Sequence, residues 1–458
     1  MVSDERKGAP LNLTEGSLFK KILIFSLPLM LSNVLQVLFN MSDIAVVGRF
    51  AGSAALGAVG STSTLVMLFT GFVIGIGSGV NSLVAKYIGA KSDEDVSSSC
   101  YSAFVVSLVI GFIISALGIG LSKPFLLLLN TKPELLDGAV LYIRIYFCGM
   151  PALALYNFGN GVFSADGDTK RPLIFLTIAG IINILLNLLF VIVFKMSVAG
   201  VALASIISQA LSATLILIAL FRTKRPYRLS LKNFKVSKEK VKSVLMLGIP
   251  AGFQFAIFSA ANLFIQAGVN SFDTVMVEGN SAAANADAFV YDIMAAFYTA
   301  CTSFISQNHG AGKDERILKS YFISLIYSFG IGFVVSGALL LCGRQFLGIF
   351  TTEKEVIDAG MKRLTIMCLS YAISAFMDCT IAAARGLGKT VIPTVIVIMG
   401  SCVFRIIWVY TIFRYFKTIP SLYLLYSFSW TITAIAEIIY FAFIYKRRIR
   451  KIPEKETE

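Results

Sequence analysis

Asp43 is an acidic residue late in a long apolar segment, within the sequence FNMSDIAVVG. A charged side chain near the centre of a bilayer costs about 2.5–3.5 kcal/mol on insertion scales, and such residues usually serve a function. Gln36 precedes Asp43 by two helical turns, so both side chains would face the same way on a helix. Asn183 and Asn187 lie one turn apart in a second apolar segment, IINILLNLLF, and could meet this acid.

Asn160 and Ser205, in two further apolar segments, are candidates for the same polar cluster. A carboxylate among carboxamide and hydroxyl oxygens suits a proton or a hard monovalent cation such as Na⁺. Through charge attraction it also suits an organic cation. The structural alternative for each residue is an amide or ion pair that holds helices together. The sequence therefore predicts a cation or substrate site around Asp43, with Na⁺ as one candidate occupant.

In the second half of the chain, Asp378 is the best-placed acid, within FMDCTIAAARG. Asp287, Asp292 and Glu437 also lie in apolar segments, and Arg405 is a candidate ion-pair partner for one of these acids. A structural ion pair is the alternative to a functional role for each of them. We include Asp378 among the candidate cation- or substrate-binding residues.

The remaining residue types argue against several classes of chemistry. His309 is the only histidine, and none of the seven cysteines forms a C-x-x-C pair, so neither a metal centre nor a disulfide framework is predicted. Gly388-Lys389-Thr390 resembles the end of a phosphate-binding loop, but that pattern requires a glycine where the chain has Ala383. We therefore expect neither an enzyme nor a cofactor, with Na⁺ or H⁺ acting only as a coupling ion.

The composition indicates which elements must position these residues. Of the 458 residues, 57% are hydrophobic and 14% are charged, whereas soluble proteins are nearer half apolar and one quarter charged. The net charge of +14 is spread over short segments between apolar runs, which is typical of membrane topology. Lipid is therefore the expected solvent, and nucleic acid is not an expected partner.

A transmembrane helix needs about 20 mostly apolar residues, because hydrocarbon cannot satisfy exposed backbone groups. The sequence predicts an all-α integral membrane protein with about twelve such helices. Gly71, Gly75 and Gly79 recur every four residues, a spacing that favours close packing of one helix on another. The predicted spans are 22–46, 54–83, 98–121, 136–163, 172–194, 198–221, 243–271, 281–306, 317–342, 357–384, 391–413 and 420–445.

The basic residues predict how the chain is oriented. With the N-terminus in the cytoplasm, the segments on the inside hold 28 Lys and Arg residues, counting Lys319 at the start of the ninth span, and those on the outside hold 8. This bias predicts that both termini are cytoplasmic. The longest hydrophilic stretch divides the spans six and six. We therefore predict an N-terminal bundle (1–221), a basic cytoplasmic linker (222–242) and a C-terminal bundle (243–458).

The two halves repeat each other at a nearly constant offset. Pro28 corresponds to Pro250, IGAKSDE at 88 to HGAGKDE at 309, and ADGDTK at 165 to ARGLGK at 384, which gives offsets of 222, 221 and 219 residues. Because each half has six spans, both halves enter the membrane in the same direction. In transporters, parallel repeats of this kind form two bundles that rock around a midplane cavity.

Together, these features resemble the MATE family, the multidrug and toxic compound extrusion transporters. The resemblance covers the whole chain. It includes the first-span sequence PLMLSNVLQVLFNMSDIAVVGR, the turns QNHGAGKDERI and ARGLGKTVIP, and the eleventh-span sequence RIIWVY. It implies two parallel six-helix bundles that export organic cations and other drugs by antiport against Na⁺ or H⁺.

The resemblance also implies roles for single residues. Asp43 matches the family's key first-span aspartate. Some members have an aspartate in place of Asn187 and a glutamate in place of Phe258, so this chain has fewer acids than they have. The residues that match the polar network around the aspartate are Gln36, Asn160, Asn183, Asn187 and Ser205.

The function expected from the resemblance is a cation-coupled antiporter that exports organic cations or drugs across the cytoplasmic membrane by alternating access. Its partners would be small cationic amphipathic substrates and membrane lipid, and we expect a monomer. The alternative is a flippase of lipid-linked saccharides or other amphipathic metabolites, since related families carry such cargo. Those families usually have more spans or a strongly cationic cavity.

Overall fold

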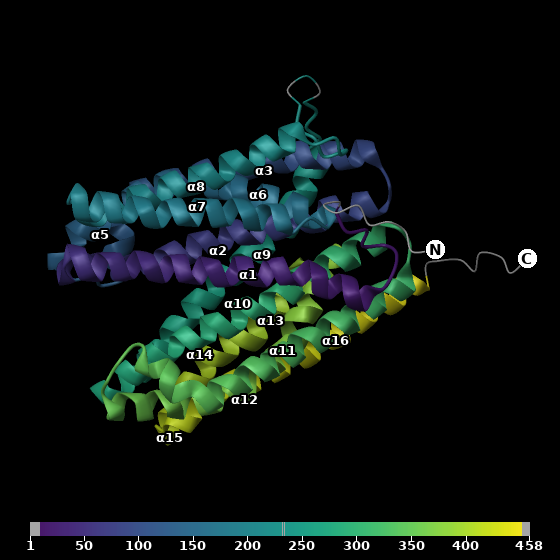
Figure 1. Ribbon diagram of the computed structural model, residues 1–458. Helices are drawn as coiled ribbons and strands as arrows, with labels where there is room; N and C mark the ends of the chain where they lie inside the picture. Colours follow the sequence, from purple (N-terminus) through teal and green to yellow (C-terminus); the bar gives the residue numbers. More distant parts are fainter. Residues whose placement is uncertain (1–9, 231, 233, 451–458) are drawn as a thin grey trace, which may run out of the picture. The chain divides into compact units, whose positions relative to one another are not determined.

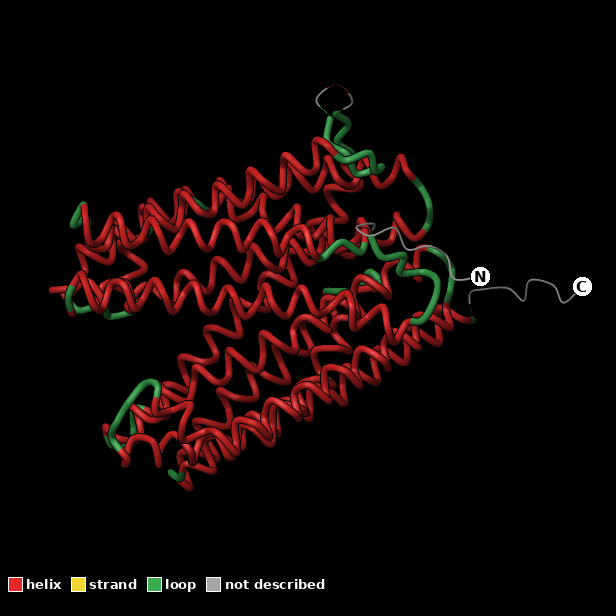
Figure 2. Tube along the Cα trace, in the orientation of Figure 1, coloured by secondary structure: helices red, strands yellow, loops and turns green. Residues whose placement is uncertain are grey.

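The computed structural model describes residues 10–230, 232 and 234–450, and nearly all of these residues are helical (Figure 2). Ten helices in this part of the chain are long and apolar enough to cross a membrane, and two bent pairs bring the candidate spans to twelve. The predicted all-α membrane fold is confirmed. Residues 1–9 and 451–458 of the two predicted bundles, and Leu231 and Asn233 of the predicted linker, lie outside the described residues.

The first six spans follow one another along the chain (Figure 1). The fourth span bends by 45° at Gly149, where Pro151 follows at the start of the next helix. Two of the spans end in a short π-helical segment, and the small helix α4 (Ser122–Leu128) follows the third span. The elements are α1 (Leu18–Val46) with η1 (Val47–Ala51), α2 (Ser53–Gly89), α3 (Asp93–Gly120), α5 (Pro133–Cys148) with α6 (Met150–Asp166), α7 (Lys170–Leu188) with η2 (Leu189–Val193), and α8 (Ser197–Arg222).

The last six spans also follow one another along the chain. The tenth span bends by 44°, near the point where the Ser370 hydroxyl donates to the carbonyl of Ile366. The eleventh span alternates between α-helical and π-helical segments. The elements are α9 (Lys238–Val269), α10 (Thr274–Gly310), α11 (Asp314–Gly348), α12 (Lys354–Gly386), α13 (Val391–Val397), η4 (Ile398–Val403), α14 (Phe404–Trp408), η5 (Val409–Phe413), α15 (Arg414–Phe416) and α16 (Ile419–Ile449).

The turns that repeat in the sequence also repeat in their backbone geometry. The α2–α3 turn places Lys91 at φ 54°, and the α10–α11 turn places Gly312 at φ 69°. The turn after α6 places Gly167 at φ 88°, and the turn after α12 places Gly388 at φ 77°. This left-handed conformation ends a helix and favours glycine. The structure thus supports the internal repeat at the level of single turn residues.

The chain forms two compact units, and each unit takes part of both long helices α1 and α9. Among the described residues, the first unit comprises Leu31–Ala256 with residues 10–12, and the second comprises Leu13–Met30 with residues 257–450. In the first unit, α6 packs against α2, α3 and α8, and in the second α12 packs against α10, α11 and α16. The predicted division into 1–221, 222–242 and 243–458 follows the repeat and stays a prediction.

Within the first unit, the glycines of α2 allow α9 to approach very closely. A Cβ atom on Gly75 would lie 2.3 Å from the backbone nitrogen of Gly252, and one on Gly79 would lie 2.6 Å from that of Gly248. Gly71 faces the Cβ atom of Phe255 in the same way. The predicted packing role of these glycines is therefore observed, and their partner is the first part of α9.

The predicted linker is docked on the first unit along much of its length. The Tyr227 hydroxyl is buried and donates to the Asp166 carboxylate over 2.9 Å, and Arg225 forms an ion pair with the same carboxylate at 3.4 Å. Burial, together with the negative Asp166, raises the pKa of the Tyr227 hydroxyl above its ordinary value. Further along, the Tyr101 hydroxyl accepts a hydrogen bond from the backbone of Ser230 over 2.9 Å. These contacts give the linker a fixed path over the helix ends.

Candidate functional site

Asp43 lies where α1 packs against α7 in the first unit. The ring of Phe39 fills the space above Gly180, since a Cβ atom there would lie 1.9 Å from the ring. One turn further along α1 and two turns further along α7, the side-chain amide of Asn187 donates to one carboxylate oxygen of Asp43 over 2.5 Å. The Ser205 hydroxyl on α8 donates to the other oxygen over 3.3 Å. The carboxylate is therefore held by neutral donors from two other helices.

Asn183 extends this group along α7. The same amide nitrogen of Asn187 that reaches Asp43 also donates to the side-chain oxygen of Asn183 over 3.2 Å. Both asparagines are buried. The amide oxygen of Asn187 accepts no hydrogen bond from the described residues. This oxygen is therefore an acceptor available to an incoming cation or proton.

Gln36 and Asn160 are not joined to this group by a hydrogen bond among the described residues. Gln36 is an exposed position on α1, although it was predicted to face the same way as Asp43. Asn160 is half-buried on α6, and its amide oxygen has no hydrogen-bond partner in the described part of the chain. The structure thus brings together Asp43, Asn187 and Ser205, with Asn183 behind them.

Two tyrosines that the sequence analysis did not select lie close to Asp43. Tyr142 and Tyr146, one turn apart on α5, interact electrostatically with its carboxylate. Their rings stack with centroids 5.8 Å apart, and the Tyr146 hydroxyl accepts a hydrogen bond from the side chain of Gln209 over 3.3 Å. The spacing of the two tyrosines in the span sequence LYIRIYF, one helical turn, could have indicated from the sequence that they share a helix face. They give the site an aromatic side.

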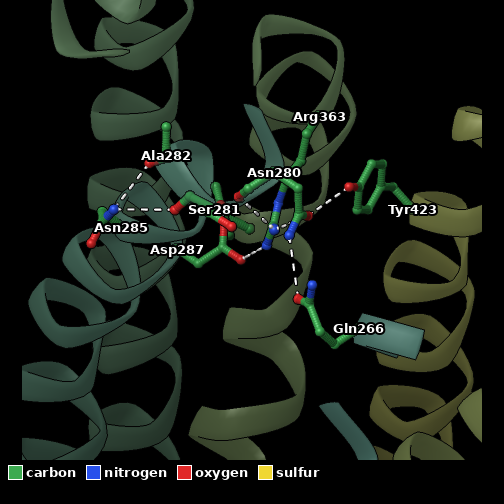
Figure 3. Close-up of polar contacts among 9 residues, drawn as sticks. Gln266, Asn280, Ser281, Ala282, Asn285, Asp287, Arg363 and Tyr423 are labelled. Atoms are coloured by element: carbon green, nitrogen blue, oxygen red, sulfur yellow. Dashed lines mark hydrogen bonds and ion pairs between the residues drawn. The ribbon is translucent and has the colours of Figure 1, made fainter. Parts of the chain in front are cut away.

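In the second unit, Asp287 is paired with Arg363 and not with Arg405, the candidate partner suggested by the sequence. Arg363 is buried and donates to the Asp287 carboxylate, which also accepts from the Tyr371 hydroxyl. Figure 3 shows this guanidinium between Asp287 and the side chain of Asn280. This acid is therefore neutralised within its own bundle.

Asp378, on α12, is buried in a different way. One of its carboxylate oxygens has no hydrogen-bond partner among the described residues. It interacts electrostatically with Arg385 on the same helix and with Arg405. Glu437 on α16 is fully buried, and neither of its carboxylate oxygens accepts a hydrogen bond from the described residues. Asp378 thus lies in a charged group of the second bundle, apart from the Asp287 pair.

No group of three His, Cys, Asp or Glu side chains is arranged to hold a metal ion in the described part of the chain. A cation at Asp43 would therefore use amide and hydroxyl oxygens beside one carboxylate. Asn183 and Asn187 supply two such amide oxygens, and Ser205 supplies a hydroxyl. Oxygen ligands of this kind suit hard cations.

The comparisons with known proteins agree with this architecture. The MatE family model matches residues 28–189 and 250–411, one segment in each half. The chain belongs to the MATE family. Both ends of the second matched segment lie 222 residues after those of the first (28 to 250 and 189 to 411), so the MATE model recognises the internal repeat.

The curated relatives are similar over most of their length. "Probable multidrug resistance protein YpnP" of Bacillus subtilis (strain 168) is 31% identical over 364 residues, which cover 79% of this chain and 80% of that protein. "Probable multidrug resistance protein YoeA" of the same organism is 26% identical over 443 residues, 95% of this chain and 96% of that protein. These similarities place the whole described chain in the MATE family.

A solved structure supports the fold. An outward-facing conformation of a multidrug resistance MATE family transporter of the MOP superfamily matches with a TM-score of 0.89. The match covers 96% of this chain and 98% of that one at 22% sequence identity. The chain is therefore a multi-pass membrane protein with the MATE fold.

Proposed function

We propose that this chain is a cation-coupled antiporter that exports organic cations and related drugs across the cytoplasmic membrane. The observation that carries the proposal is the Asp43 carboxylate, held inside a membrane bundle by Asn187 and Ser205 without a basic partner at hydrogen-bond distance among the described residues. The charge of such an acid can be neutralised by a bound proton or cation. The names of the two Bacillus relatives support drugs as the cargo.

The geometry is compatible with proton coupling. An ionised Asp43 accepts from Asn187 and Ser205, as in the structure. A protonated carboxyl group becomes a donor, and it then needs an acceptor. Rotation of the Asn187 amide would present its oxygen, which accepts nothing from the described residues, to that proton. Loss and gain of the proton would therefore rearrange the contacts among α1, α7 and α8.

The geometry is equally compatible with sodium coupling. Na⁺ would take an oxygen of Asp43, the amide oxygens of Asn183 and Asn187, and the Ser205 hydroxyl. A ligand shifts a conformational equilibrium only by as much as it prefers one state. The coupling ion would bind Asp43 better in one access state. A cationic drug would need the same carboxylate ionised and free in the other state, so the ion and the drug would exclude each other. That exclusion is the physical basis of exchange by alternating access.

The proposal is tested in proteoliposomes that carry an imposed Na⁺ gradient or pH gradient, one at a time. Uptake of ethidium is measured for the wild type, Asp43→Asn and the control Asp358→Asn. Asp358 is an exposed acid that forms an ion pair with Arg344 at 2.7 Å. We expect one of the two gradients to drive uptake, and Asp43→Asn to reduce that uptake at least about tenfold while the control remains near the wild type.

Unchanged gradient-driven uptake in Asp43→Asn would contradict the role assigned to this carboxylate. Uptake that ignores both gradients would contradict cation coupling itself. Transfer of a labelled lipid-linked saccharide without any drug transport would favour the flippase alternative. A monomer in the cytoplasmic membrane, with both termini in the cytoplasm, forms part of the same proposal.

A further inference from the structure

Arg405 is a buried cation in the second unit that forms no ion pair with a carboxylate among the described residues. It lies on α14, and its side chain is 2% exposed. Its Nε atom donates to the Ser429 hydroxyl over 3.1 Å, but Nη2 has no hydrogen-bond partner among the described residues. The acid that interacts electrostatically with it is Asp378, which makes no hydrogen bond or ion pair with it that the structure records. A buried donor without an acceptor is costly.

Three aromatic rings surround this guanidinium. Its central carbon lies 4.5 Å from the ring centre of Tyr426, 5.5 Å from that of Phe258 and 5.7 Å from that of Trp430. Ring faces attract a cation, which offsets part of the cost of burying it. They do not satisfy N–H groups that point outward in the plane of the guanidinium. We call Phe258, Arg405, Tyr426, Ser429 and Trp430 the Arg405 cage.

The internal repeat relates the Arg405 cage to the Asp43 site. At the offset of 222 residues given by the two matched segments, Arg405 corresponds to Asn183 and Phe258 corresponds to Gln36. The second half thus has a cation and a ring at positions where the first half has amides. Equivalent positions of the repeat therefore carry different side-chain chemistry in the two halves.

The backbone around Arg405 also departs from a regular helix. The π-helical segments η4 and η5 flank α14 on both sides. In the first half, η1 follows Asp43 and η2 follows Asn187 in the same manner. Single π-helical turns often occur at functional sites, because they widen a helix and release backbone groups. The cage therefore shares a local backbone feature with the candidate cation site.

We propose that the Arg405 cage binds the carboxylate of an aromatic substrate. A guanidinium presents paired N–H groups in a planar fork that fits a carboxylate, and Nη2 supplies the unused donors. The rings of Tyr426, Trp430 and Phe258 provide surfaces against which a planar ring can pack. The inference rests on the transport function proposed above, and it adds anionic and zwitterionic aromatic compounds to the substrates.

Direct binding is measured on the full-length protein in lipid nanodiscs. The chain has two tryptophans, so Trp408→Phe leaves Trp430 of the cage as the only fluorescent indole. Benzoate is titrated against the emission of Trp430, with the uncharged isostere benzamide as the matched ligand. We expect saturable quenching by benzoate and none by benzamide. Absence of benzoate quenching, or equal quenching by benzamide, would overturn the proposal.

Two variants of this single-tryptophan protein test the guanidinium itself. Arg405→Gln should weaken benzoate binding at least about tenfold, and Arg405→Lys, which keeps the charge without the fork, should weaken it less. Because Arg405→Gln could misfold, Ser429→Ala serves as a milder variant that removes the hydrogen bond from Arg405 Nε to the Ser429 hydroxyl. It should also weaken benzoate binding. Unchanged binding in all three variants would refute the assignment.

Transport then separates a ligand role from a merely structural one. Ciprofloxacin carries a carboxylate on an aromatic ring, and its methyl ester does not. Arg405→Lys should raise the KM for ciprofloxacin about tenfold and leave that for the ester within about twofold of the wild type. An equal loss of transport for ciprofloxacin and its methyl ester would mean that Arg405 has only a structural role. Ethidium uptake by the wild type tests the antiport function separately, so benzoate binding without ethidium uptake would refute only the latter.

Discussion

At the scale of single residues, half-buried acids of the two bundles are held by different kinds of donor. Asp287 accepts from Arg363 and Tyr371, so its negative charge is compensated by a cation of its own bundle. Asp43 accepts only from the neutral donors Asn187 and Ser205 in the hydrogen bonds described above. An acid held by neutral donors can change its charge more readily than one in a buried ion pair. This contrast favours Asp43 as the ion-binding acid.

The Arg363–Asp287 pair gives a prediction about stability. Arg363→Met leaves Asp287, whose side chain is 27% exposed, inside the bundle without its cation. Loss of one partner from a fully buried pair costs about 3–5 kcal/mol, which is the upper bound here. The matched control is Arg344→Met, which breaks the Arg344–Asp358 pair, whose side chains are 65% and 53% exposed. An exposed pair is worth about 0–1 kcal/mol. Thermal unfolding in detergent should show a clear loss only for Arg363→Met.

Equal thermal stability of these two variants would show that the network in Figure 3 does not hold the second bundle together. A double variant, Arg363→Met with Asp287→Leu, refines the test. Replacing both charges by apolar groups removes the uncompensated acid, so this variant should recover much of the lost stability.

Sequence reasoning located several site residues but not their exact partners. The proximity of Asp43, Asn187 and Ser205 was expected, because polar residues in apolar spans are few and a family resemblance related them. Their role in binding stays a prediction. Gln36 is exposed despite its spacing, since a shared helix face does not say which neighbour covers each turn. Arg405 was the candidate partner for an acid, whereas Arg363 pairs with Asp287, because charge pairing depends on packing between distant segments.

At the scale of elements, the sequence predicts where the spans lie, but it does not predict that two helices are shared between the two compact units. Hydropathy located the spans to within seven residues at each end, and the helices continue past the apolar runs in most cases, as α2 does from Leu83 to Gly89. Nothing in the hydropathy pattern indicates that α1 and α9 each contribute to both compact units. That arrangement depends on contacts between helices far apart in the chain, which hydropathy does not describe.

The close contact between α2 and α9 gives a second prediction. Gly75→Ala places a methyl group 2.3 Å from the backbone nitrogen of Gly252, so the two helices must separate. Overpacking of this kind costs about 1–3 kcal/mol. Gly60→Ala on the same helix is the control, because nothing lies within 4 Å of the added atom. The melting temperature should fall for Gly75→Ala and stay constant or rise slightly for Gly60→Ala.

If both glycine variants melted at the same temperature, α2 and α9 would not pack as closely as described. Fluorescence-detected size-exclusion chromatography adds a second measure, since a loosened bundle should aggregate on heating before the control does. Ethidium uptake by folded Gly75→Ala would further show whether the transport cycle requires this close approach.

At the scale of the whole molecule, the repeat conserves backbone geometry and varies chemistry. The paired turns at Lys91 and Gly312, and at Gly167 and Gly388, have the same left-handed conformation. After the second of these turns in each half, Asn183 of the first half is replaced by Arg405 in the second. Backbone geometry is fixed by the need to end and reverse helices, whereas side chains within a bundle are free to diverge. The two related bundles can therefore carry different binding chemistry.

The orientation of the repeat gives the last prediction. Asn130 and Thr352 are exposed loop residues 222 positions apart, so a parallel repeat places both on the same side of the membrane. The excess of Lys and Arg in the other loops, 28 against 8, predicts that this side is the outside. Single cysteines at these positions, and at Lys224 in the linker, are made after the seven native cysteines are replaced.

A membrane-impermeant maleimide applied to intact cells should label Asn130→Cys and Thr352→Cys, and should label Lys224→Cys only after the membrane is permeabilised. Labelling of Asn130→Cys without Thr352→Cys would mean that the halves are inverted, and a midplane site would then be built from opposed helix ends. Labelling of Lys224→Cys in intact cells would mean that the whole molecule has the opposite orientation in the membrane. Export driven by an inward cation gradient would then require Asp43 to meet the ion from the opposite side. The labelling pattern therefore tests the direction of transport together with the topology.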